Sequence, residues 1–269
     1  MAPVIAARDV SYAYPDGTLG LDGVDVTLDP GERVAVLGPN GSGKSTLQLV
    51  LGGLEPPESG HVEYFGGERD PERVRDRLAV LLQDPDDYLF NSTVREDLEY
   101  GPAQLDVPRE TAQQRIDRLA DALHLDGLLD RPPFRLSAGE KERAALAAAL
   151  ATGPDVLLLD EPTSNLDGPG RERVLGVLDD VAAQGTTLVT FTPGTDLVPR
   201  VADRVLLLGA GGSVVARGSV REILTDAELL AEQGLRPPAT VRLFDDLVAD
   251  PPLTVSDGRT LLGDTDLTR

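Results

Sequence analysis

The chain has 269 residues, enough for one large domain or two small ones, and 41% of them are hydrophobic, which suffices for an ordinary core. It has no cysteine, which excludes a disulfide framework and a thiolate metal site. Its formal net charge of -21 gives a surface that repels nucleic acid, so we expect no nucleic-acid partner. No apolar run has the length of a membrane span and no signal peptide is apparent, so we expect a soluble, intracellular chain.

The acidic surface is built mainly from aspartate. The sequence contains 30 Asp and 16 Glu but only two lysines, Lys44 and Lys141. The simpler interpretation is an acidic protein with no special adaptation. We favour adaptation to high salt, because screening by salt weakens the repulsion between surface carboxylates. In a chain so poor in lysine, we expect each lysine to have a specific role.

The N-terminal part contains three short, turn-rich segments in which polar and apolar residues alternate. They are "PVIAARDVSYAY" (3–14), "LDGVDVTLDPGE" (21–32) and "GHVEYFGG" (60–67). Alternation is typical of strands that have one buried and one solvated face. These segments therefore predict a small antiparallel sheet.

The rest of the chain alternates apolar strand patterns with helical patterns. Five strand patterns lack alternation, as expected in a parallel sheet covered on both faces: Arg33–Gly38, Leu78–Gln83, Asp155–Glu161, Thr186–Phe191 and Arg204–Gly209. Three helical patterns accompany them: 42–54, 138–153 and 170–185. Strands that alternate with helices predict an α/β fold.

Two further segments have no strand signal. The segment from about Asp84 to Arg135 is interpreted as loops and helices inserted between two core strands. The stretch from Ser219 to Pro238 has a helical pattern that stops at its two final prolines.

A phosphate-binding motif lies at "GPNGSGKST". Its residues, all candidates for nucleotide binding, are Gly38, Pro39, Asn40, Gly41, Ser42, Gly43, Lys44, Ser45 and Thr46. The motif follows a predicted strand and opens a predicted helix, where backbone N–H groups and the helix dipole can cradle phosphates. Lys44 can reach the β- and γ-phosphates, and Ser45 can bind Mg²⁺. The alternative, a glycine-rich turn without a ligand, is disfavoured by this context.

A second motif, "DVLLLDEP", is a buried strand that ends in two carboxylates. An unpaired buried charge is too costly to serve as core filling, so these acids indicate a functional site. We expect Asp160 to hold Mg²⁺, directly or through water, and Glu161 to polarise the attacking water as the general base.

Two longer stretches resemble a known family. "LSAGEKERAALAAALATGPDVLLLDEPTSNLD" (Leu136–Asp167) resembles the signature motif, Walker B strand and D-loop of ABC-type ATPases, and the resemblance covers nearly the whole chain. "LLQDPDDYLFNSTVREDLEYGP" (Leu81–Pro102) resembles the Q-loop region of ATPases from energy-coupling-factor transporters, the importers of vitamins, cobalt or nickel. The later stretch "LLAEQGLRPP" is also similar to that subfamily.

The resemblance implies the P-loop NTPase fold of ABC ATPases: an α/β core with a mostly parallel sheet, an N-terminal antiparallel β subdomain and an inserted helical subdomain. It divides the chain into an ABC ATPase domain at 1–218, with the helical subdomain at about 84–152, and a helical extension at 219–269 packed on the same domain. The implied cofactors are ATP and Mg²⁺. The implied partners are integral membrane transporter subunits and a second ABC ATPase subunit, with the chain at the cytoplasmic face of the membrane.

The resemblance also assigns roles to two residues outside the phosphate loop. Tyr14 falls where the family stacks an aromatic ring on adenine, which a flat ring face can do; the alternative is a core tyrosine. Gln83 would contact Mg²⁺ or the attacking water, and would sense the membrane partner.

The implied signature residues, Ser137, Ala138, Gly139 and Glu140, act on the ATP held by the other subunit of a dimer. The helix that starts at Ala138 would aim its N-terminus at that γ-phosphate. Ala138 replaces the family's first glycine and Glu140 its glutamine. A carboxylate close to a triphosphate is unfavourable unless it points away or salt screens it. Asp167 would lie at the seam between the subunits.

One departure from the family lies in "TFTPGTDLV" (Thr190–Val198). The family ends this strand in Thr-His-Asp, and the histidine contacts the γ-phosphate. Here Thr192 keeps its place, Pro193 replaces the histidine and Gly194 replaces the aspartate. The chain's two histidines lie elsewhere in the sequence. Proline supplies no side-chain donor, so the switch residue is missing, unless a shifted turn lets Thr192 or Thr195 replace it.

Together these features favour an ATP-hydrolysing subunit that powers a vitamin or transition-metal importer through ATP-driven closure of a dimer. One alternative is a weakly hydrolysing regulatory subunit paired with a competent ATPase. A less favoured alternative is a soluble ABC ATPase that acts on DNA or ribosomes, which would need a long coiled-coil or basic insertion that this sequence lacks. The transported substrate is not encoded in any of these motifs.

Overall fold

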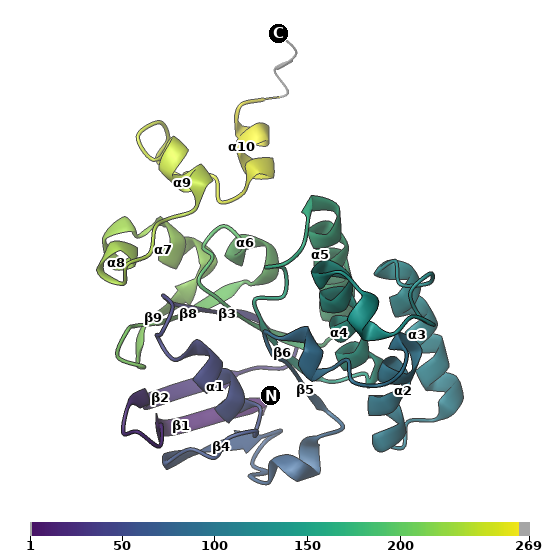
Figure 1. The fold of residues 1–269 in the computed structure, drawn as a ribbon. Helices are drawn as coiled ribbons and strands as arrows, with labels where there is room; N and C mark the ends of the chain where they lie inside the picture. The colour runs from purple at the N-terminus through teal and green to yellow at the C-terminus, as the bar shows by residue number, and fades with distance from the viewer. Residues whose placement is uncertain (1, 264–269) are drawn as a thin grey trace.

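Two sheets with helices around them build the fold in the computed structural model, which describes residues 2–263 (Figure 1). One sheet has three antiparallel strands and the other has six mostly parallel strands. The predicted α/β class, with an antiparallel sheet next to a mostly parallel one, is confirmed. Within residues 2–263, no helix combines the length and the apolar character needed to cross a membrane.

The antiparallel sheet contains the three segments that the alternating patterns predict. Its strand order is β2-β1-β4, with bounds Ile5–Ala13 for β1, Leu19–Leu28 for β2 and Ser59–Tyr64 for β4. Ile5 lies in the middle of the sheet, paired with Leu28 on one side and Tyr64 on the other, and all three are buried.

The larger sheet has the strand order β5-β6-β7-β3-β8-β9. The strands run over Arg33–Leu37 (β3), Leu78–Leu81 (β5), Val156–Asp160 (β6), Thr187–Thr192 (β7), Arg204–Leu208 (β8) and Val214–Ser219 (β9). The first five are the predicted strands, and they pair in parallel. Every residue of β6 and β7 is buried, which explains why their sequences show no alternation.

Strand β9 is an addition that the sequence analysis missed. It pairs with β8 in the antiparallel direction, at the edge of the sheet. None of its residues is fully buried, because only one side of the strand faces the protein. Its sequence, "VVARGS", therefore lacks the apolar run that identified the central strands.

Helices cover the larger sheet, and further helices lie to one side of it. The helices between the strands of this sheet are α1 (Lys44–Leu51), α4 (Ala138–Ala151), α5 (Gly168–Ala183) and α6 (Val198–Val201). Between β5 and β6 the chain also forms η2 (Pro85–Asp87), α2 (Val94–Gln104), α3 (Arg109–Ala122) and η3 (Pro133–Arg135), while η1 (Pro71–Val74) precedes β5. The helices α2 and α3 lie together to one side of the sheet in Figure 1. The predicted helical insertion between two core strands is therefore present.

The C-terminal part forms four short helices instead of one helical stretch. They are α7 (Val220–Thr225), α8 (Ala227–Glu232), α9 (Ala239–Phe244) and α10 (Val255–Leu261). The side chain of Asp226 accepts the Leu229 N–H and so starts a new helix at Ala227, which breaks the predicted pattern. The chain becomes helical again directly after Pro238. In Figure 1, α9 and α10 lie beyond α6 and α7, at the far end of the molecule from the antiparallel sheet.

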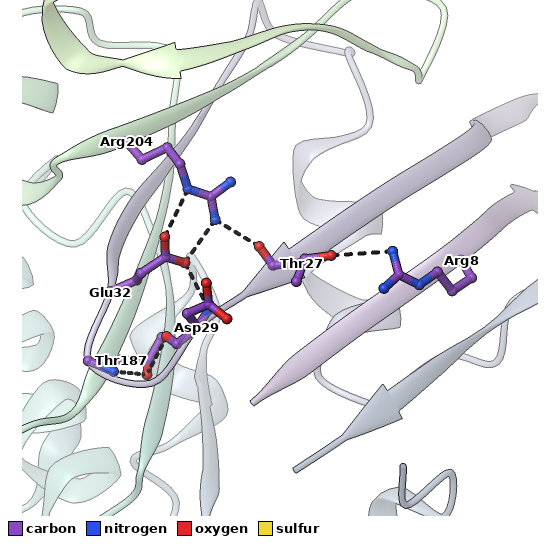
Figure 2. A network of polar contacts seen from close by, with 7 residues as sticks. Arg8, Thr27, Asp29, Glu32, Thr187 and Arg204 are labelled. Carbon is purple, nitrogen blue, oxygen red and sulfur yellow. Dashed lines mark hydrogen bonds and ion pairs between the residues drawn. The ribbon is translucent and has the colours of Figure 1, made fainter. Parts of the chain in front are cut away.

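A polar network joins the two sheets where β3, β7 and β8 begin (Figure 2). The Arg204 guanidinium donates two hydrogen bonds to the Glu32 carboxylate, at 3.1 and 2.8 Å, and a third to the Thr27 carbonyl at 2.7 Å. The Thr187 hydroxyl accepts the Gly31 N–H at 2.9 Å. Because the network lies at the amino ends of the strands, it fixes the sheets to each other and leaves the carboxyl ends free for a site.

Candidate functional site

The loops that follow three of the parallel strands meet at one cavity. The strands are β3, β5 and β6, and ligands in such sheets bind outside the carboxyl ends. A cavity of about 400 Å³ lies there and is lined by Tyr14, Thr18, Leu19, Gly20, Asn40, Gly41, Gly43, Lys44, Ser45, Thr46, Gln83, Asp160 and Glu161. Residues predicted from separate motifs are therefore brought together around one space.

The phosphate loop curls around the buried ammonium of Lys44. The Lys44 Nζ donates to the carbonyls of Gly38 and Pro39, both at 2.9 Å. Burial lowers the pKa of Lys44, and the nearby carboxylates of Asp160 and Glu161 oppose that shift. Gly43 makes the curl possible: its φ is +90°, and a Cβ would lie 2.3 Å from the Gly20 carbonyl oxygen. The loop thus presents its backbone and one cation to the cavity.

Ser45 and Asp160 form the candidate metal site. The Ser45 hydroxyl donates to the Asp160 carboxylate at 2.8 Å. Burial raises the pKa of Asp160, while the Ser45 hydrogen bond and the Lys44 charge oppose the shift. The described residues contain no cluster of three or more metal-binding His, Cys, Asp or Glu side chains. A few oxygen ligands fit Mg²⁺, which keeps several waters and takes further ligands from substrate phosphates.

Glu161 is placed by an unusual backbone conformation directly after β6. Its φ is +45°, in the left-handed region that non-glycine residues rarely adopt. Its N–H donates to the Phe191 carbonyl of β7 at 3.0 Å, which holds the turn in place. Strain of this kind is concentrated at functional sites. The turn puts the residue on the cavity wall beside Asp160.

Tyr14 lies at the mouth of the cavity and not in the core. Its side chain is 42% exposed, which rules out the alternative of a core tyrosine. Its hydroxyl is hydrogen-bonded to the Thr46 hydroxyl, and its ring packs edge-on against Tyr12 with centroids 5.3 Å apart. This exposure leaves the ring accessible from the cavity, and adenine stacking on Tyr14 stays a prediction.

Gln83 lines the cavity next to a tyrosine anchor that the sequence analysis did not identify. The Tyr88 hydroxyl donates to the Val80 carbonyl and accepts the Leu82 N–H, the latter at 3.0 Å. Burial raises the pKa of Tyr88 to about 12. The anchor fixes the chain directly before Gln83. Only the folded loop reveals it, because both partners are backbone groups.

The signature residues lie at the start of α4. None of residues 137–140 is among the described residues that line the cavity around Lys44. Ser137 caps the helix: its hydroxyl accepts the Glu140 N–H at 3.3 Å, and the Glu140 carboxylate accepts the Ser137 N–H at 2.7 Å. That backbone hydrogen bond lowers the pKa of Glu140. The carboxylate that replaces the family's glutamine is thus turned back onto its own helix.

Comparison with known proteins identifies the family. Residues 21–164 match the ABC transporter family. The chain is 43% identical to the cobalt import ATP-binding protein CbiO of Rhodobacter capsulatus, over 90% of this chain and 88% of that protein. It is 38% identical to the energy-coupling factor transporter ATP-binding protein EcfA of Methanothermobacter thermautotrophicus, over 91% of this chain and 80% of that protein.

The chain belongs to the ABC transporter family. It also superposes on a solved structure of cbiO1 from Clostridium perfringens, described as part of the transporter complex cbiONQ. The TM-score is 0.74 with 31% identity, and the match covers 91% of this chain and all of the other. The expected resemblance to ABC ATPases of the energy-coupling-factor type is confirmed, and with it ATP binding and ATP hydrolysis as the activity of the family.

In this ABC ATPase the D-loop packs against the signature helix. Asp167 caps α5 by accepting the Gly170 N–H at 2.8 Å. Glu142, which the sequence analysis did not single out, accepts the Asn165 N–H at 3.1 Å while its Oε1 is buried with no hydrogen-bond partner among the described residues. Burial raises the pKa of Glu142. The side chain therefore joins the D-loop to α4, and it lines a small pocket together with Asp160 and Glu161.

At the switch position of this ABC ATPase, Pro193 follows directly after β7. Pro193 and Glu161 line the same groove, whose volume is about 910 Å³ and which lies next to α9 and α10. The two threonines that could replace a histidine already have partners: the Thr192 hydroxyl accepts the Gly194 N–H at 3.0 Å, and the Thr195 hydroxyl donates to the Arg236 carbonyl at 2.8 Å. Thr195 thus donates its proton to Arg236, whereas the Thr192 hydroxyl only accepts here and keeps its own proton for donation.

Proposed function

We propose that this chain is the ATP-hydrolysing subunit of an energy-coupling-factor-type importer, bound to the cytoplasmic face of the membrane. The observation that carries the proposal is the cavity that unites Lys44, Ser45, Asp160 and Glu161 at the carboxyl ends of the parallel strands. The names of the relatives, a cobalt import protein and an energy-coupling factor protein, support the transport role. The cargo would be a transition-metal ion or a vitamin, carried by the membrane subunits.

The residues around the cavity divide the work on ATP. Tyr14 stacks on the adenine, the phosphate loop holds the phosphates through backbone N–H groups, and Lys44 contacts the β- and γ-phosphates. Ser45, Asp160 and Gln83 hold Mg²⁺, which neutralises charge on the phosphates when it is bound. Glu161 takes the proton of the attacking water.

Two ATPase subunits close on two ATP molecules, and hydrolysis reopens them. Ser137 and Gly139 of one subunit contact the ATP in the other, and the start of α4 adds its dipole. Asp167 lies at the seam between the subunits. The second subunit is either another copy of this chain or a different ABC ATPase. Opening and closing of this interface moves the cytoplasmic helices of the membrane subunits.

Replacing Lys44 by alanine tests the proposed ATP site. The variant loses charge-assisted hydrogen bonding to phosphate that is worth about 1.5–3 kcal/mol in total, so we expect ATP affinity to fall about 10- to 150-fold. Equilibrium binding of a fluorescent ATP analogue with Mg²⁺ measures the change, and a thermal melt checks that the variant is folded. Lys141→Ala is the matched control, because it removes the chain's other lysine, which does not line the cavity. Unchanged affinity in Lys44→Ala would refute the site.

One observation favours a second candidate function, a regulatory subunit that binds ATP but hydrolyses it slowly. Pro193 lies where the family has its switch histidine, and the proline side chain itself supplies no donor. Lys44, Asp160 and Glu161 are all in place, which favours a competent enzyme. The rate of ATP hydrolysis by the purified chain distinguishes the two.

We also propose that the protein works at high salt. The net charge of -21 leaves strong repulsion between surface carboxylates unless salt screens it. The Debye length grows from about 3 Å at 1 M salt to about 10 Å at 0.1 M. We therefore expect the melting temperature to fall when KCl is reduced from about 1 M to about 0.1 M. A neutral solute at matched osmolarity is the control, and an unchanged melting temperature would contradict the proposal.

A further inference from the structure

The second of the two lysines connects two loops that are far apart in the sequence. Lys141 directly follows the signature residues, in the first turn of α4. Its Nζ lies 2.5 Å from the Asp86 carboxylate, and its side chain is only 20% exposed. Asp86 belongs to η2, three residues after Gln83. The ion pair is therefore a direct link between the signature helix and the Q-loop segment, defined here as residues 83–88.

The Q-loop segment is held as a unit. The Asp84 side chain accepts the Asp86 N–H at 3.0 Å and so caps η2. At the other end of the segment, the Tyr88 hydroxyl is fixed to the backbone on both sides of Leu81. Gln83, which lines the nucleotide cavity, directly precedes the Asp84 cap along the chain.

The first turn of α4 is also held as a unit. The capping box between Ser137 and Glu140 fixes the start of the helix, and the Lys141 N–H donates to the Ser137 carbonyl at 2.9 Å. Gly139 allows close contact with the D-loop: a Cβ on it would lie 3.3 Å from the Asn165 carbonyl oxygen. A displacement of Lys141 therefore carries Ser137 with it.

We propose that Lys141 is a positioning residue whose ion pair with Asp86 makes the Q-loop segment and Ser137 move as one body. The proposal rests on the proposed function, because Ser137 acts only when two ATPase subunits close. A force exerted by a membrane subunit on the Q-loop segment would thus reach the serine that completes the other subunit's ATP site. By thermodynamic reciprocity, closure around ATP would also displace the Q-loop segment.

Stability alone does not account for this pair. Asp86 is 60% exposed, and ion pairs of exposed groups contribute little to folding. The separation of 2.5 Å is shorter than the Debye length of about 3 Å at 1 M salt, so direct contact retains the attraction where longer-range interactions are screened. Removing a pair that transmits position but adds little stability should change kcat without changing the melting temperature.

The first experiment is a double-mutant cycle on the purified chain. Lys141→Ala and Asp86→Ala should each lower kcat of ATP hydrolysis about 2- to 30-fold, and the double variant should lose no more than either single one. Affinity for ATP and melting temperature should stay unchanged, because the pair lies outside the cavity. Lys141→Arg should retain activity, and exchanging the two charges should restore it. Independent, additive losses, or a charge exchange that restores nothing, would overturn the proposal.

Arg95→Ala is the matched control. Arg95 forms an exposed ion pair with Asp130 in the same helical region, at 3.2 Å, without involving α4. Its removal should change kcat by less than twofold if the effect of Lys141 is specific. A loss in Arg95→Ala as large as that in Lys141→Ala would indicate general loosening and would contradict the proposal.

Hydrogen exchange without turnover separates this proposal from the proposed function. In Asp86→Ala, amides at 137–143 should exchange about 2- to 30-fold faster, although the substitution lies in another loop. Lys141→Ala should have the reciprocal effect on amides at 84–88, and Arg95→Ala should affect neither segment. If the wild-type chain binds no ATP, the proposed function fails, but the exchange result still decides the coupling. Changes confined to the substituted loop would refute it.

Discussion

Replacing Glu161 by glutamine should leave ATP binding intact and lower the rate of hydrolysis about 10²- to 10⁴-fold, the usual contribution of a general base. Glutamine has nearly the same size but cannot accept the proton of the attacking water. The fold should not change, because the turn is held by the Glu161 backbone N–H, and no hydrogen bond to the Glu161 side chain is formed within residues 2–263. Single-turnover hydrolysis of ATP measures the chemical step, and light scattering with Mg²⁺-ATP should detect a trapped, closed dimer.

Glu172→Gln is the control for this substitution. Glu172 lines the groove beside Glu161, but its carboxylate forms an ion pair with Arg200 at 3.1 Å and is well exposed. The Glu172→Gln variant should hydrolyse ATP at the wild-type rate. If Glu161→Gln stays monomeric with ATP and turns over normally, the base is another group.

Local motifs predicted which residues meet around the cavity, while their roles stay predictions. The phosphate loop and the strand that ends in Asp160 each contain their candidate residues within a few positions. Because both faces of β6 and β7 are buried, their sequences lack polar–apolar alternation, so a place for both strands inside a covered parallel sheet could be expected. Because parallel strands present their carboxyl ends at one edge, placing the two motifs together required no further information.

The elements that the sequence did not reveal depend on long-range contacts or on partial burial. Strand β9 is half-exposed and has no apolar run, and α8 starts separately because of a single cap at Asp226. The pairing of Lys141 with Asp86 joins residues 55 positions apart, so no local pattern encodes it. Glu142 looks like an ordinary charged residue of a helix until its neighbour in the D-loop is known. The domain boundaries inferred from the sequence stay predictions.

The missing switch histidine has a consequence that depends on the dimer. A homodimer would lack the histidine at both ATP sites. In a heterodimer with a histidine-bearing ATPase, one site would combine the partner's phosphate loop and histidine with Ser137 and Gly139 of this chain. The capping box that turns the Glu140 carboxylate back onto its own helix favours a functional signature helix. We therefore expect either slow hydrolysis by this chain alone, or one dominant site in an asymmetric pair.

Replacing Pro193 by histidine should accelerate hydrolysis by the purified chain. A lost transition-state hydrogen bond of this kind costs about 2.7–4 kcal/mol, so regaining it would raise kcat about 10²- to 10³-fold. The turn should accept the change, because its Thr192–Gly194 hydrogen bond does not involve the proline. Steady-state ATPase assays compare the wild-type chain with Pro193→His. Both are measured in about 1 M salt, where the Debye length is about 3 Å. Pro193→Ala is the control: it removes the ring without adding a donor and should gain nothing. If the wild-type chain is already fast and histidine gives no gain, another group orients the γ-phosphate, and no asymmetry between the two sites is required.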